Sequence, residues 1–141
     1  GATRGYAYLI QLVGYHVWRA AWLRDRDGEE PITITLADAR KGIESALEEF
    51  KTAVLETAIS DLPKTAIDFI LAMSDMSDVA SVAEIAKVLG KSSGYLCPYR
   101  RKLISRQVIE PTAPGFVTFS IPFMKEYLQE SREEILARYG E

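Results

Sequence analysis

Five basic side chains fall within sixteen residues of the second half of the chain, with no acidic residue among them. Arginine can read guanine in the major groove of DNA, and lysine, serine and threonine can contact phosphates. The candidate DNA-binding residues are Lys91, Ser93, Tyr95, Arg100, Arg101, Lys102, Arg106 and Thr112. The competing interpretation is a solvated cationic helix face. The formal net charge is −3, so any basic surface has to be local.

The basic residues belong to a segment whose apolar spacing predicts a helix over about residues 93–106. At about 100° per residue, Leu96, Leu103 and Ile104 share the face that would enter a core. The residues predicted to point away from that core are Gly94, Pro98, Arg101 and Ser105, with Tyr95 and Lys102 on the flanks.

Pro98 conflicts with this helix, because a proline in a helix interior costs about 3 kcal/mol and clashes with the carbonyl of the residue four positions earlier, here Gly94. Two alternatives follow. Either the helix begins late, near Cys97, so that Pro98 lies in its first turn, or it is kinked at Pro98. Both would change how Ser93 and Tyr95 are presented.

The elements around this segment predict a winged helix-turn-helix domain. A helix over residues 66–76 precedes a second one that Ser81 caps and Gly90 ends, and short strands at 108–110 and 116–119 follow the basic helix. Residues 111–115 have turn chemistry, and Pro122 is predicted to open one final helix. This hairpin tip carries no Arg or Lys, so it would be structural or would reach phosphates only through its backbone and Thr112.

The first half of the chain has a different character. An aromatic-rich helix is predicted over residues 6–23, and a second from Leu36 to about Ile59, capped by Thr35 with Asp38 three residues on. Residues 1–62 hold 7 basic and 10 acidic residues, and residues 63–141 hold 10 of each. The predicted fold is mainly α with a small antiparallel β-hairpin. The predicted domains are an incomplete helical subdomain over 1–62, which the resemblance described below makes lid-type, and a winged helix-turn-helix domain over 63–141.

No combination of residues indicates catalysis in this chain. One histidine and one cysteine cannot supply a metal site, so no metal and no cofactor are expected within it. His16 is predicted to be packed and hydrogen-bonded, and Cys97 to be a small buried or half-buried filler. No apolar run reaches the length of a membrane span and no internal disulfide can form, which favours a cytoplasmic location and no membrane partner.

Three segments resemble the C-terminal part of bacterial ATP-binding proteins of the AAA-type ATPase superfamily. They are GYAYLIQLVGYHVWRAA at 5–21, ADARKGIESAL at 37–47, and AEIAKVLGKSSGYLCPYRRKLISRQVIEP with GFVTFSIPFMKEYL within 83–128. In such proteins a helical lid and then a winged helix follow the nucleotide-binding core. The resemblance therefore implies a longer protein, with the ATP and magnesium site upstream of Gly1.

The resemblance also assigns a weak nucleotide-sensing role to Arg4, Gly5 and Tyr6. Gly5-Tyr6-Ala7 matches the Gly-Tyr-Pro opening of the lid helix in that family, with Ala7 in place of the proline. No GxxxxGK[ST] motif occurs in the chain, so it lacks the phosphate-binding loop itself.

Two functions are open at this point. In the first, the winged helix binds double-stranded DNA and couples it to the upstream ATP site. In the second, it is a protein-interaction or autoregulatory module that docks on its own ATPase core or on a partner. DNA binding requires Arg100, Arg101, Lys102, Arg106 and Lys91 to form one exposed patch. The aromatic N-terminal helix would also allow a homo-oligomer.

Overall fold

The computed structural model describes residues 2–24, 28 and 33–139. It divides into two compact units, which we call the hairpin unit, Thr3–Glu56, and the C-terminal unit, chiefly Thr57–Glu141. Helices make up most of both units, and the only sheet among the described residues is small, three-stranded and antiparallel. The prediction of a mainly α fold is confirmed at this level. The sequence predicted the boundary between the two domains near residue 62, and the division between the two compact units falls between Glu56 and Thr57.

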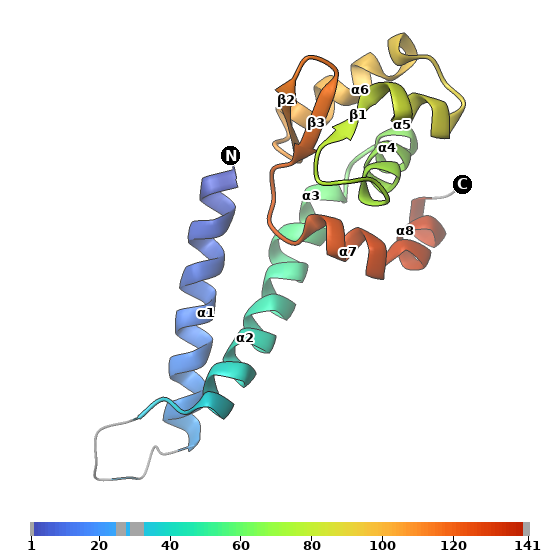
Figure 1. Cartoon of the computed structure of the whole chain (residues 1–141). Helices are drawn as coiled ribbons and strands as arrows, with labels where there is room; N and C mark the ends of the chain where they lie inside the picture. Colours follow the sequence, from blue (N-terminus) through green and yellow to red (C-terminus); the bar gives the residue numbers. More distant parts are fainter. Residues whose placement is uncertain (1, 25–27, 29–32, 140–141) are drawn as a thin grey trace. The chain divides into compact units, whose positions relative to one another are not determined.

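Two antiparallel helices, α1 (Ala2–Arg24) and α2 (Leu36–Phe50), lie side by side in the hairpin unit (Figure 1). Their apolar positions recur at helical spacing, so one stripe on each helix can be buried against the other. The buried residues are Leu9, Leu12, Ala21, Ala46 and Phe50. The Tyr8 and Phe50 rings lie 6.2 Å apart between the two helices. Most of the aromatic residues of α1 stay exposed, including Trp18 and Trp22.

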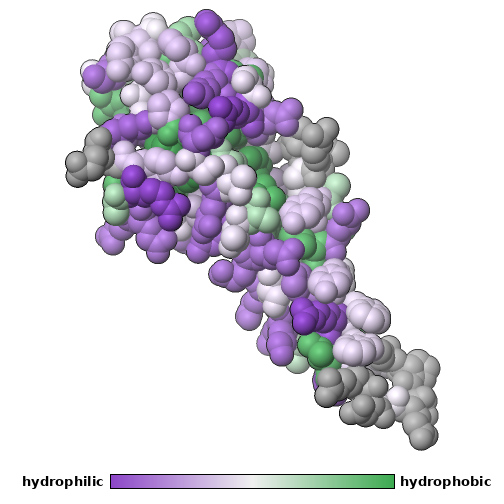
Figure 2. Space-filling view, turned by 180° about the vertical axis from the view of Figure 1, so that it is seen from behind, coloured by the Kyte–Doolittle hydropathy of each residue, from purple (hydrophilic) through white to green (hydrophobic). Residues whose placement is uncertain are grey.

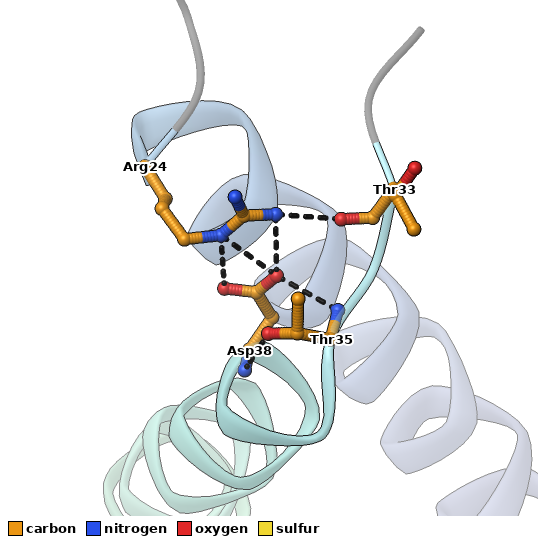
Figure 3. A network of polar contacts seen from close by, with 4 residues as sticks. All are labelled: Arg24, Thr33, Thr35 and Asp38. Atoms are coloured by element: carbon orange, nitrogen blue, oxygen red, sulfur yellow. Dashed lines mark hydrogen bonds and ion pairs between the residues drawn. The ribbon is translucent and has the colours of Figure 1, made fainter.

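A polar network ties the C-terminus of α1 to the N-terminus of α2 (Figure 3). The Thr35 hydroxyl accepts from the Asp38 amide at 3.2 Å, and the Asp38 carboxylate accepts from the Thr35 amide at 2.9 Å, so the predicted capping box is confirmed. Arg24 donates to both oxygens of the same carboxylate and to the Thr33 carbonyl. The buried Asp38 carboxylate therefore accepts from the backbone at the N-terminus of α2 and also pairs with a cation from α1.

This network predicts a defined acid sensitivity of the hairpin unit. The hydrogen bond from Arg24 lowers the pKa of Asp38 from 3.8 to about 2. A carboxyl whose pKa is lowered by folding stabilises the fold above its unfolded pKa and loses that contribution as the pH falls through the folded value. The stabilisation by Asp38 should therefore be complete above pH 3.8 and disappear toward pH 2.

Asp38→Asn removes the titrating group and tests this expectation. The difference in unfolding midpoint between wild type and Asp38→Asn should shrink as the pH is lowered through that window. The fluorescence of Trp18 and Trp22 can follow the transition, because both tryptophans of the chain lie on α1. A difference that stays constant across the window would contradict this role of Asp38.

After Phe50 the backbone continues through a π-helical segment, η1 (Lys51–Glu56), into a single short turn, α3 (Thr57–Ile59). The sequence predicted one uninterrupted α-helix from Leu36 to about Ile59, so the helical state is correct and its uniform α geometry is wrong. A π segment shifts the i→i−4 hydrogen bonds to i→i−5, and the apolar spacing of a short stretch does not distinguish the two.

Three helices form the core of the C-terminal unit: α4 (Lys64–Ser74), α5 (Val82–Leu89) and α6 (Ser93–Ser105). Helix α4 is buried almost all round, with Phe69 and Ile70 fully inaccessible. Ser81 caps α5, accepting from the Glu84 amide at 3.4 Å. Gly90, at φ 68°, ends α5 in the left-handed conformation, as predicted.

The sheet consists of β1 (Ala80–Ser81), β2 (Ile109–Ala113) and β3 (Phe116–Phe119) in the order β1-β3-β2 (Figure 1). Ile109 pairs with Phe119, and Ala80 pairs with Val117. The sequence predicted two strands and a five-residue turn. Instead, β2 extends to Ala113, and β1 is an additional strand. Strand β1 has only two residues, which is too short for an alternating apolar and polar pattern to appear in the sequence. Only its pairing with β3 identifies it as a strand.

The chain ends in two short helices, α7 (Met124–Glu130) and α8 (Arg132–Tyr139), where the sequence predicted one helix from Pro122. Both attach to the C-terminal end of α4. Lys125 donates to the Met76 carbonyl and Arg132 to the Leu71 carbonyl. The Leu71 carbonyl also accepts from the Ser74 hydroxyl, and Met76 lies just beyond α4. Both cations therefore bind carbonyls at or next to the C-terminus of this helix, where positive charge is favoured.

Among the described residues, no helix is both long and apolar enough to cross a bilayer. The face of the molecule drawn in Figure 2 is largely hydrophilic, with hydrophobic residues visible between the polar ones.

Candidate nucleic-acid interface

Helix α6 is fixed at both ends. The Ser92 hydroxyl accepts from the Tyr95 amide at 3.0 Å, which caps the N-terminus. At the C-terminus, Gln107 takes a positive φ of 61°, and the Val108 amide donates to the Leu103 carbonyl at 3.0 Å. These bonds complete a Schellman motif. Leu96 and Leu103 are fully buried, so the rotation of α6 about its axis is set by its core face.

The opposite face of α6 is exposed as the helical spacing predicts. Gly94, Pro98, Arg101 and Ser105 are all exposed, and Tyr95 is 46% accessible. The Lys91 ammonium lies 4.9 Å from the centre of the Tyr95 ring, and Tyr95 in turn lies 5.9 Å from Tyr99. This cation–π contact holds Lys91 beside the N-terminal half of the helix.

Arg106 and Lys102 differ from Lys91 and Arg101 because they lie near an acidic residue, with which Arg106 forms an ion pair. Arg106 donates to the Asp61 carboxylate, which comes from the segment just before α4. The Arg106 hydrogen bond, with a smaller contribution from Lys102, lowers the pKa of Asp61. Local sequence patterns could not reveal this ion pair, because its partners are 45 residues apart.

Arg100 does not join the exposed patch either. It is half-buried, and its Nε is buried without a hydrogen-bond partner. The five cations therefore divide into three groups: Lys91 and Arg101 are exposed, Arg106 is exposed but paired with Asp61 with the half-buried Lys102 nearby, and Arg100 is half-buried. Ser93 and Thr112 are both exposed, Ser93 at the start of α6 and Thr112 on β2.

Pro98 lies inside α6, which begins at Ser93, so the alternative of a late start near Cys97 is wrong. Proline has no N–H, and the usual bond to the Gly94 carbonyl therefore cannot form. Gly94 is exposed, and the nearest atom from outside the helix backbone to a Cβ at this position would be the Ser92 hydroxyl oxygen at 3.9 Å. The helix thus keeps Ser93 and Tyr95 in its first turn despite the proline.

Cys97 is exposed, which corrects the expectation of a buried or half-buried filler. The reason is its position on the outward face of α6, one residue past the buried Leu96. His16 is packed and hydrogen-bonded as predicted, with its Nε2 3.0 Å from a carboxylate oxygen of Glu49.

The three predicted nucleotide-sensing residues lie in the first turns of α1. The Arg4 side chain is outside the described part of the structure, Gly5 is half-buried and Tyr6 is 53% accessible. Within the described ranges, no three His, Cys, Asp or Glu side chains come together in a way that could hold a metal ion.

A family model matches residues 52–128, which cover more than half of the chain and include all of α4 to β3. No curated protein and no solved structure matches the chain. The matched family is described as a domain of unknown function, so it adds no activity to the geometry. The chain belongs to this family, the domain of unknown function DUF8462.

Proposed function

We propose that the C-terminal unit is a winged helix-turn-helix module that binds double-stranded DNA through the exposed face of α6. One observation carries the proposal: Tyr95 and Arg101 are exposed on α6, with the exposed Lys91 just before it, and the opposite face of this helix is packed into the core through Leu96 and Leu103. The element order and the sheet order β1-β3-β2 support it, because they match a recognition helix followed by a wing.

The module itself is non-catalytic. In line with the resemblance described above, we propose that it forms the C-terminal region of an AAA-type ATPase and couples DNA to an upstream ATP and magnesium site. The hairpin unit then corresponds to the helical lid. On this proposal DNA binding is modest and phosphate-dominated, since among the five cations of residues 91–106 only Lys91 and Arg101 are both exposed and away from Asp61.

The second candidate is a module that docks on its own ATPase core or on a protein partner. The neutralisation of Arg106 by Asp61 favours it, because that ion pair removes charge from the DNA-facing patch. The two candidates differ in how they respond to charge at Asp61 and Arg101.

Charge-changing variants test the DNA proposal against matched controls. Arg101→Gln should weaken binding to a labelled random-sequence duplex by about tenfold, as expected for one lost arginine contact. Arg138→Gln removes the same charge from an exposed site on α8 and should leave affinity nearly unchanged. Equal effects of the two variants would mean that only net charge matters and would contradict a specific role for α6.

Asp61→Asn provides a test in the opposite direction. It removes the anion beside Arg106 and Lys102 and should therefore strengthen DNA binding severalfold. Asp68→Asn is a suitable control, because Asp68 pairs with Lys64 on α4 rather than with the α6 cations. A gain with Asp61→Asn and none with Asp68→Asn supports the DNA proposal. No binding by any variant at low salt would favour the docking module.

A further inference from the structure

A cavity of about 470 Å³ opens between the N-terminal ends of α5 and α6 and the tip of the β2–β3 hairpin. Its volume is within the range of pockets that bind small molecules. Val82 and Phe116 provide apolar walls, and Ser93, Cys97 and Arg100 line the α6 side. All of these residues belong to the C-terminal unit, so the cavity is formed within one compact body.

Arg100 is the only charged residue that lines this cavity, and it lacks a partner there. Its Nε is buried without a hydrogen bond, and no acidic residue lines the cavity in the described part of the chain. A buried N–H donor without an acceptor is costly, and buried polar groups of this kind are nearly always paired. An anion supplied from outside would satisfy the guanidinium.

The walls restrict the class of anion. A guanidinium presents a planar pair of donors that matches a carboxylate. A single lining cation balances one negative charge, whereas a phosphate dianion would leave excess charge buried beside Val82 and Phe116. The same apolar walls favour a ligand with an apolar body, and Ser93 adds a polar residue to the lining.

We propose that this cavity binds a small monocarboxylate with an apolar body, and that its carboxylate pairs with Arg100. The inference goes beyond DNA binding and does not depend on it. Because the cavity adjoins the first turn of α6, such a ligand would lie beside the face that we propose for DNA.

Cys97 provides a direct readout, because it is the one cysteine of the chain, is exposed and lines the same cavity. Its alkylation by iodoacetamide can be timed at fixed pH and ionic strength with three probes: benzoate, cyclohexanecarboxylate and 3-phenylpropionate. We expect at least one of them to slow alkylation in a saturable manner. Benzamide, which has the shape of benzoate without its charge, should not.

Arg100→Gln tests the assigned partner, and Arg101→Gln is its matched control on the neighbouring, exposed position. Arg100→Gln should weaken the binding of the protecting carboxylate by about tenfold or more, as expected for the loss of a charge-assisted hydrogen bond. Arg101→Gln should leave protection unchanged. Circular dichroism of both variants checks that each is folded, and the comparison of benzoate with benzamide needs no variant.

Four results would overturn the inference. They are no protection by any of the three carboxylates up to the millimolar range, equal protection by benzamide, full protection in folded Arg100→Gln, and tighter protection by phenyl phosphate than by the carboxylates. The last result would show that the site prefers a phosphate. None of these outcomes depends on whether the protein binds DNA.

Discussion

Gly42→Ala is expected to destabilise the hairpin unit strongly, although alanine is the better helix former. A Cβ at position 42 would lie 2.5 Å from the Cα, N and Cγ2 atoms of Val17 on α1. Two of these are backbone atoms, so the helices would have to move apart. Overpacking of this kind costs about 1–3 kcal/mol, and we expect the upper part of that range after alanine's helix propensity is included.

Gly14→Ala is the matched control, because Gly14 is on α1 and a Cβ there would meet no atom within 4 Å. Here only helix propensity acts, and the substitution should stabilise the unit by up to about 1 kcal/mol. Urea unfolding followed by the fluorescence of Trp18 and Trp22 measures both variants. Shifts of the midpoint in the same direction would contradict the close approach of the two helices at Gly42.

Leu103→Ala should have the second large effect, in the C-terminal unit. Leu103 is fully buried on the core face of α6, and its carbonyl accepts from the Val108 amide at the helix end. Truncating a buried leucine to alanine costs about 2–5 kcal/mol, depending on how far the cavity collapses. That is a large part of the stability of a small domain.

Ser105→Ala is the control for this variant, because Ser105 is exposed on the same helix. It should change stability by no more than about 0.5 kcal/mol. Hydrogen exchange measured by mass spectrometry on peptides from α4 and α6 distinguishes the two variants. Equal protection from hydrogen exchange in the two variants would mean that the Leu103 side chain does not anchor α6.

Local signals in the sequence predicted much of this fold. Thr35 with Asp38, Ser81 with Glu84, and Gly90 each act through bonds within one helical turn, and each lies where it was predicted. The buried face of α6 followed from the spacing of Leu96 and Leu103. Such features depend only on neighbouring residues, so periodicity and capping rules are sufficient to identify them.

The features that were missed depend on contacts between distant segments. Strand β1 exists only because Ala80 and Ser81 pair with Val117 and Phe116. The division of the last helix into α7 and α8 accompanies the anchoring of Lys125 and Arg132 on the end of α4. Neither contact leaves a mark in the local pattern.

The same limit applied to the candidate site. The sequence grouped five cations by proximity along the chain, whereas the fold divides them. Asp61, in the segment before α4, forms an ion pair with Arg106. Arg100 lines a cavity that the β2–β3 hairpin helps to form. Clustering in sequence therefore identified α6 as the candidate helix but overestimated its exposed, unpaired charge.

The salt dependence of binding to a random-sequence DNA duplex tests the central proposal most directly. We expect the wild-type chain to bind at low salt, with an affinity that falls linearly in a double-logarithmic plot. The slope should correspond to about two neutralised phosphates, matching Lys91 and Arg101, and Arg101→Gln should reduce it by about one unit. No binding at low salt, or a slope that Arg101→Gln leaves unchanged, would contradict DNA recognition through α6.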